Sequence, residues 1–206
     1  MKTLVKLLLA TLVIIGTHAE ANPYPYRGDG YTPLRPNYQD IGPAKLLATG
    51  IKRMREFLAQ HGTDDPAKLY RFLETEIIPY FDFERMAAWV AKPHYERMAE
   101  NQKTGFRSRL QEVFLKTLAN QIGMFSKPQP RIDFLRPRRS GPNEMVASAR
   151  VLPVKGYPVR LTFRFWKGPQ GWKVIDASAN GTSAVRYYRQ QFIERARRSG
   201  RRPFGR

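Results

Sequence analysis

The chain has 206 residues, with 36 lysines and arginines against 17 aspartates and glutamates, and it has no cysteine. Its formal net charge of +19 favours anionic partners, such as phospholipid head groups, lipopolysaccharide, acidic proteins or nucleic acid. The lack of cysteine excludes disulfides and cysteine-bound metal, and the length suits one domain with a substantial core.

The first residues have the pattern of a secretory signal peptide. Two lysines near the start precede the apolar residues 7–16, and the small residues Ala19 and Ala21 follow. An apolar run of roughly ten residues is about half of what a membrane-spanning helix needs. We therefore expect segment 1–21 to be removed during export, with cleavage after Ala21 or, as the alternative, after Ala19. Export makes nucleic acid the least expected anionic partner.

The rest of the chain divides into three parts by composition. Residues 22–43 carry five prolines and three glycines without an apolar period, which predicts an extended lead-in. Periodic apolar residues follow, so we expect a single folded domain over 44–200. Residues 201–206 read RRPFGR and form a basic tail, for which fraying and attraction to an anionic membrane are the two interpretations.

Two helices are expected at the start of the domain. Apolar residues at helical spacing begin at Ala44, and Gly62 suits the end of this first helix. A second helix begins at an N-cap supplied by Asp64 or Asp65. It breaks at Pro79, because proline lacks the amide hydrogen that a helix interior uses.

Two more helices are expected after the break. Asp82 can cap a short helix that starts at once, more plausibly than it can act as a functional acid. A long helix then runs from about Met98 to Phe125, and Pro128 and Pro130 end it. The first half of the domain is thus predicted to be almost entirely helical.

The period then changes to two, which is typical of strands. VRLTFRF at 159–165 alternates apolar and polar residues, as do the stretches RIDFL, NEMVASARVLPV and WKVIDAS. KGPQG between Trp166 and Trp172 is predicted to be a hairpin loop, and Ser183 to cap a last helix. This order predicts an α+β fold, in which helices cover one face of a curved antiparallel sheet and a pocket can lie between the layers.

One stretch is unusual for a core helix. IIPYFDFERMAAWV, residues 77–90, gathers aromatic side chains around a helix break. Ordinary core is one interpretation. The other is that the break splays the helices, so that their apolar faces surround a space instead of meeting.

Two motifs carry a resemblance to a known family. PYFDFERM at 79–86, together with GWKVIDASANGTSAVRYYRQQF at 171–192, resembles the MlaC family, also called toluene-tolerance auxiliary proteins, which are periplasmic phospholipid carriers. The resemblance covers essentially residues 44–200. The chain departs from the family at Lys92 and Tyr95, where a glycine and a tryptophan are usual, and it ends in arginines where the family commonly has an apolar tail.

The resemblance implies an NTF2-like cone with a deep apolar cavity for the acyl tails and the head group at its mouth. Arg186 and Arg189 are the candidates to hold the head group, with a solvated helix face as the alternative. About half of the expected lining residues can equally be plain core. The expected lining is Tyr80, Phe81, Phe83, Met86, Val90, Phe106, Leu110, Phe114, Val146, Leu161, Phe163, Phe165 and Trp172.

The resemblance also implies partners and a location. Phospholipid would be the cargo, with no cofactor, and the protein would dock only peripherally to membranes in the periplasm. It would exchange lipid with an inner-membrane ABC transporter that has an MCE-domain subunit, and with an outer-membrane lipoprotein and its porin. Such exchange contributes to outer-membrane lipid asymmetry.

An NTF2-like enzyme acting on a small hydrophobic substrate is the alternative function, because the same cone hosts isomerases with a pocket carboxylate. After export only His61 and His94 remain, and no metal-binding spacing or G-x-S-x-G nucleophile motif exists. Asp176 is the one carboxylate within an apolar run, and we expect it to serve hydrogen bonding. No catalytic residue and no metal ligand is therefore predicted.

Overall fold

The structure is a computed structural model that describes residues 42–123, 130–154 and 156–198. The predicted signal peptide, nearly all of the lead-in and the basic tail lie outside these residues. The elements in chain order are α2 (Gly42–His61), α3 (Pro66–Phe72), η2 (Leu73–Ile77), η3 (Ile78–Tyr80), α4 (Phe83–Ala91), η4 (Tyr95–Arg97), α5 (Glu100–Gly123), β1 (Arg131–Phe134), β2 (Arg138–Gly141), β3 (Glu144–Leu152), β4 (Val159–Gly168), β5 (Gly171–Ala179), β6 (Thr182–Ser183) and α6 (Ala184–Arg198).

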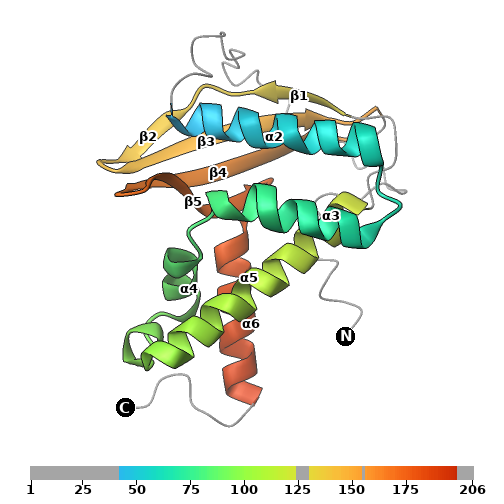
Figure 1. The fold of residues 1–206 in the computed structure, drawn as a ribbon. Coiled ribbons are helices and arrows are strands. Elements are labelled where there is room, and N and C mark those ends of the chain that lie inside the picture. Colours follow the sequence, from blue (N-terminus) through green and yellow to red (C-terminus); the bar gives the residue numbers. More distant parts are fainter. Residues whose placement is uncertain (1–41, 124–129, 155, 199–206) are drawn as a thin grey trace, which may run out of the picture.

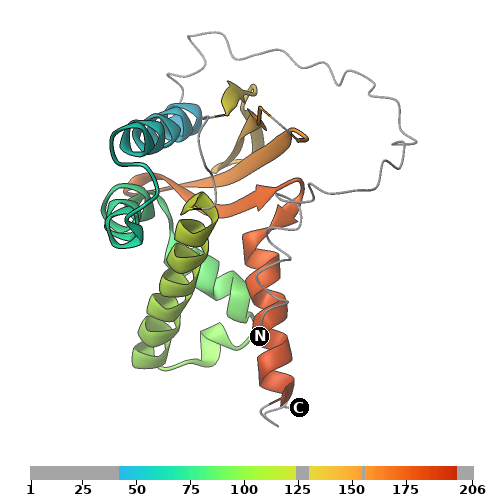
Figure 2. The same ribbon diagram turned by 90° about the vertical axis from the view of Figure 1, so that its right-hand side faces the viewer.

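The strands form one antiparallel sheet, which confirms the predicted α+β class. Its order is β1-β3-β4-β5-β6, with β2 pairing onto β3 beyond the end of β1. In Figure 1, α2 lies across one face of the sheet, while α5 and α6 extend away from it. The view in Figure 2, turned by 90°, shows α6 leaving the sheet beside α4 and α5.

The predicted helix caps are confirmed. Asp65 accepts a hydrogen bond from the Lys68 amide at 3.0 Å and caps α3. Asp82 accepts from the Arg85 amide at 3.0 Å and caps α4. The Ser183 hydroxyl accepts from the amide of residue 186 at 3.1 Å at the start of α6. These side chains satisfy amides that have no partner inside the helix.

Two boundaries differ from the prediction. The chain after α3 stays helical through a π turn and a 3-10 turn as far as Tyr80, because Pro79 occupies the first turn of the 3-10 helix, where no amide hydrogen is needed. The hairpin loop between β4 and β5 is also shorter than the predicted five-residue loop KGPQG. Lys167, Gly168 and Gly171 pair within the strands, so the turn consists of residues 169–170.

Helix α2 is held on the sheet by a small hydrophobic cluster, which we call the sheet cluster. Its buried members are Leu47 on α2 and Ala147, Ala149, Phe165 and Val174 on the strands. The two alanines of β3 leave room for the helix to approach. Gly42, at φ +34°, lies so close to Trp172 that an added Cβ would be 2.8 Å from the indole Nε1.

A larger cluster, which we call the helical cluster, lies between the other helices. It joins the end of α2 to α3, η2, α4, α5 and α6. Phe57 of α2 stacks on Phe72 of α3, with ring centroids 4.2 Å apart. Leu73 and Met86 have no exposed surface. Helix α2 therefore packs against the sheet near its start and against the helices near its end.

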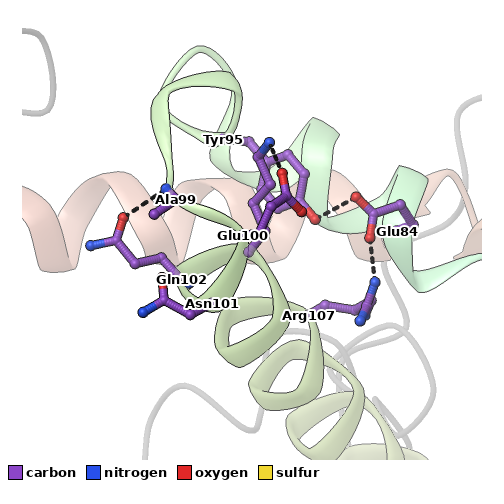
Figure 3. Close-up of polar contacts among 8 residues, drawn as sticks. Glu84, Tyr95, Ala99, Glu100, Asn101, Gln102 and Arg107 are labelled. Carbon is purple, nitrogen blue, oxygen red and sulfur yellow. Dashed lines mark hydrogen bonds and ion pairs between the residues drawn. The ribbon is translucent and has the colours of Figure 1, made fainter.

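A polar network fastens α4 to the segment that precedes α5 (Figure 3). The Tyr95 hydroxyl donates to Glu84 Oε1 at 2.7 Å, and Arg107 Nη1 donates to Glu84 Oε2 at 2.6 Å. The hydrogen bond from Tyr95 is the largest cause of the lowered pKa of Glu84, and burial raises the pKa of Tyr95 to about 12. Tyr95, one of the departures from the family pattern, thus has a structural role that its hydroxyl supplies.

Replacing Gly42 by alanine should detach the start of α2 from the sheet, because the new methyl group overlaps the Trp172 indole. We expect the free energy of unfolding to fall by about 1–3 kcal/mol. Chemical denaturation measures this change. Gly50→Ala is the matched control, because no heavy atom lies within 4 Å of its added Cβ and alanine favours helix. Equal losses in the two variants would contradict the close contact at Trp172.

Replacing Tyr95 by phenylalanine should lower the free energy of unfolding at pH 7 by about 1 kcal/mol, because the ring stays and the hydrogen bond to Glu84 is lost. The lowered pKa of Glu84 stabilises the fold above its ordinary value of 4.5, and this contribution disappears as pH falls through the folded pKa. The raised pKa of Tyr95 stabilises the fold below pH 10, and this contribution disappears as pH rises through about 12.

The difference between wild type and Tyr95→Phe should therefore shrink at both ends of the pH range. Urea denaturation across the pH range measures it. Tyr157→Phe is the control, because the Tyr157 side chain is 81% exposed. A difference that stays constant from acid to alkaline pH would contradict the assigned hydrogen bond.

Candidate functional site

The helix break in the aromatic stretch is the point at which the chain crosses onto the sheet. Phe81 forms an isolated parallel bridge with Val174 of β5. The Asp82 amide donates to the Val174 carbonyl at 2.8 Å, and Lys173 Nζ donates to the Pro79 carbonyl at 2.6 Å. The break therefore has a definite structural purpose, since it frees backbone groups that then pair with a strand.

Three phenylalanine rings meet just inside this crossing. The ring centroids are 5.0 Å apart for Phe81 and Phe114, 5.5 Å for Phe83 and Phe114, and 5.8 Å for Phe81 and Phe83. Phe81 packs against both the helical cluster and the sheet cluster. The three rings, which we call the aromatic junction, are therefore the place where the two hydrophobic interiors of the protein are continuous.

The expected lining residues fall into four groups: those outside both clusters, the one that both clusters share, those in the helical cluster and those in the sheet cluster. Val146 is buried on the face of the sheet opposite the sheet cluster, and Tyr80 and Leu161 are half-buried outside the two clusters. Phe81 is shared by both clusters. The helical cluster contains Phe83, Met86, Val90, Phe106, Leu110 and Phe114, and the sheet cluster contains Phe163, Phe165 and Trp172. The structure thus brings most of them to the two interiors that meet at the aromatic junction, and their lining of a cavity stays a prediction.

A solvent-open groove of about 340 Å³ lies between α2 and β1. Its floor includes Ile51, Ile132 and Phe134, which also pack against the sheet cluster. Lys52, Arg55 and Glu56 of α2 line its wall, and Lys52 is ion-paired with Glu56. The groove therefore leads from a charged rim to the apolar layer between α2 and the sheet.

These groove residues were missed at the sequence level. Ile132 and Phe134 lie in RIDFL, which the alternation marked as a strand without indicating which face it buries. The register now shows that they stand opposite Val151 and Ala149, on the side that α2 covers. The small residues of β3 could have indicated the covered face of the sheet, because alanine at alternate positions leaves room for another element to approach that face.

The opposite face of the sheet is polar. Directly opposed residues share a face of an antiparallel sheet, so pairing places Val146 between Arg138 and Arg164, with Asp176 next along the row. A second row across the same face contains serine and threonine, and the hydroxyls of Ser148 and Thr162 are 3.0 Å apart. A pocket of about 370 Å³ lies over this face, between the strands, α4 and the start of α6.

The two head-group candidates have different surroundings. Arg189 Nη1 donates to the carbonyl of Trp89 at 2.9 Å and to that of Lys92 at 2.8 Å. Its guanidinium thus satisfies carbonyls at the end of α4, a structural task. Arg186, in contrast, lines the pocket over the polar face. The head-group role of both residues stays a prediction.

Asp176 has the hydrogen-bonding role that the sequence suggested. Its side chain is buried, and it accepts from the Ser183 hydroxyl at 2.7 Å and from the Val185 amide at 3.2 Å. Within the described residues, no group of histidines and carboxylates could hold a metal ion. No described helix is both long and apolar enough to cross a bilayer.

Comparisons with known proteins agree with this architecture. A solved structure, the phospholipid-binding protein from Ralstonia solanacearum in complex with a phospholipid, covers 76% of this chain and 88% of its own, with 19% identity and a TM-score of 0.67. This likeness shows a shared fold. No curated protein matches the chain. The family model of the MlaC protein matches residues 50–202. That match spans both sequence motifs and nearly all of the described fold, and the chain therefore belongs to the MlaC family.

Proposed function

We propose that this protein binds a phospholipid by its acyl tails and carries it through the periplasm between membrane complexes. The family match over residues 50–202 carries this proposal. The shared fold with a protein whose structure contains a phospholipid supports it. Under this proposal the carrier is exported by the predicted signal peptide and contributes to outer-membrane lipid asymmetry.

The proposed tail site extends from the groove between α2 and β1 to the aromatic junction. The groove floor and the sheet cluster share residues, so a tail that enters the groove stays on apolar surface as it moves inward. Among the residues of α2, only Pro43, Ala44, Leu47 and Phe57 are buried. The start of α2 therefore has a small apolar attachment to the sheet, which a tail can replace with its own contacts.

Burial of tails has a consequence for release. Each buried methylene contributes about 0.8 kcal/mol, so a tail of about sixteen carbons contributes on the order of 12 kcal/mol before other costs. Release into water would be extremely slow at that magnitude. A carrier therefore needs partners that offer the tails another apolar surface. By family these are the inner-membrane ABC transporter with its MCE-domain subunit, and the outer-membrane lipoprotein with its porin.

Two carboxylates, Asp176 and Glu84, have structural hydrogen bonds that do not favour the enzyme alternative. Asp176 accepts hydrogen bonds from Ser183 and Val185, and Glu84 accepts from Tyr95 and Arg107. Each carboxylate thus has a structural partner on both oxygens. Neither Glu84 nor Tyr95 lines the groove at α2 or the pocket over the polar face.

The mature protein, residues 22–206, should co-purify with phospholipid. Solvent extraction followed by mass spectrometry should find about one phospholipid molecule per protein, because tails buried this deeply exchange slowly with water. Protein unfolded and refolded without lipid provides the empty reference. Repeated recovery of protein without bound phospholipid from cells rich in phospholipid would contradict the proposed function.

Phe163→Asp should lower the retained phospholipid at least tenfold, because a carboxylate in the sheet cluster makes the apolar space costly to occupy with tails. The same extraction measures the loss. Tyr157→Asp is the matched control, since it places the same charge at a side chain that is 81% exposed. Circular dichroism and thermal unfolding test whether both variants fold. If Phe163→Asp does not fold, Phe163→Ala is used in its place. Unchanged lipid in the folded variant would remove Phe163 from the lining.

A further inference from the structure

Three arginines from three different elements line the pocket over the polar face of the sheet. Arg138 comes from β2, Arg164 from β4 and Arg186 from α6. The pocket lies on the face of the sheet opposite the sheet cluster and α2, and its volume is about 370 Å³. This volume is sufficient for a small ligand or a head group. The fold therefore places three arginines around a hollow that the proposed tail site does not use, with Asp176 also in the lining and Glu144 ion-paired with Arg164.

The register explains why these side chains converge. Arg138 and Arg164 both stand beside Val146 on the same face, so their strands are separated by only one other strand. Neighbouring strands lie about 4.8 Å apart, and an arginine side chain is long enough to reach over one such spacing. Arg186 approaches from the side, three residues after Ser183, which pairs with Ser178 of β5. The three guanidinium groups can therefore meet above one small area of the sheet.

The acceptors described around the pocket already have partners of their own. Glu144 accepts from Arg164 Nη2 at 3.1 Å, and Arg164 also lies 4.7 Å from the centroid of the Trp89 ring. Asp176, the carboxylate in the pocket lining, accepts from Ser183 and Val185. Among the described residues, the side chains of Arg138 and Arg186 have no hydrogen bond and no ion pair. The pocket thus has more donors than acceptors.

Trp89 forms one wall of the pocket, although 41% of its surface is exposed. The Trp89 ring on α4 lies over the guanidinium of Arg164 on β4. In the reverse arrangement, the guanidinium of Arg85 on α4 lies 3.2 Å from the centroid of the Trp166 ring on β4. These two contacts between arginine and tryptophan connect α4 to the sheet next to the pocket. Arg164 is therefore held in place before any ligand arrives, which lowers the entropy lost on binding.

We propose that this pocket is a binding site for a phosphate group, with Arg138 and Arg186 as its direct ligands and Arg164 as a positioned third cation. Guanidinium groups bind phosphate through paired N–H donors, and phosphate offers more acceptor oxygens than a carboxylate for donors that arrive from several sides. Free phosphate and the head group of a phospholipid share this chemistry. The head group would belong to a phospholipid of a membrane and not to the carried one, because the proposed tail site lies on the opposite face of the sheet. This source rests on the proposed function, which brings the protein to membranes, whereas the free-phosphate source does not.

Calorimetric titration of the lipid-free mature protein tests the site with two probes, inorganic phosphate and glycerophosphoglycerol, a head group without tails. We expect at least one probe to bind the wild type. Arg138→Gln and Arg186→Gln should each weaken that binding about tenfold or more, the effect expected for the loss of a charged hydrogen-bonding group. Both side chains are exposed, so both variants should fold.

Arg139→Gln is the matched control. It removes the same charge from the neighbouring residue of β2, which pairs with Met145 and therefore points to the other face. This variant should bind like the wild type. Binding of inorganic phosphate identifies a free ion as a sufficient ligand, and binding of glycerophosphoglycerol alone identifies the head group. No binding of either probe, or an equal loss in Arg139→Gln and Arg138→Gln, overturns the site.

Failure of the phosphate site can be distinguished from failure of the proposed function. Phospholipid retained by Arg138→Gln and Arg186→Gln is measured by the same solvent extraction as for the wild type. Loss of probe binding with retained phospholipid supports a phosphate site apart from the tail site. If the wild type binds neither probe and yet carries phospholipid, the phosphate site is wrong and the carrier proposal stands.

Discussion

The fold depends on the crossing from the helices to the sheet at Phe81 and Asp82. The main-chain hydrogen bond from Asp82 to Val174 fixes the start of α4 against β5. The Asp82 side chain then caps the helix that begins there. Because both bonds involve one residue, the position of α4 and the position of the Phe81 ring are set together. The aromatic junction, where the two hydrophobic interiors meet, is a direct result.

The sheet separates two chemistries by its period of two. One face carries Ala147, Ala149 and Phe165 and meets α2 through apolar contacts. The other carries the row that includes Arg138 and Arg164, with hydroxyl groups beside it. The proposed tail site therefore has an apolar surface, and the proposed phosphate site has a charged one on the opposite face. A sheet provides both without any extra element, because neighbouring residues point to opposite sides.

Much of this arrangement could be predicted from local rules. Asp65, Asp82 and Ser183 were recognisable as caps because a cap depends only on the residues that follow it. The groove between α2 and β1 could not be predicted, because it depends on which face of β1 α2 covers, and that follows from long-range pairing. The arginine pocket is of the same kind. Arg138, Arg164 and Arg186 are far apart in the sequence, and only the register places the first two on either side of Val146.

The aromatic junction packs the protein's own side chains where the two hydrophobic interiors meet. An empty apolar cavity costs about 24 cal/mol for each Å³, so a ligand-sized cavity of about 400 Å³ would cost about 10 kcal/mol. That is comparable to the whole free energy of unfolding of a typical domain, about 5–15 kcal/mol. Phe81, Phe83 and Phe114 avoid such a cost, because their rings contact one another where the two hydrophobic interiors meet. Under the proposed function, tails that replace these contacts would supply apolar burial of similar magnitude, so loading would need a movable wall more than a permanent hollow. Helix α2 is suited to be that wall, because its start contacts the sheet through a small cluster while its end is fastened to α3 by the Phe57 and Phe72 rings.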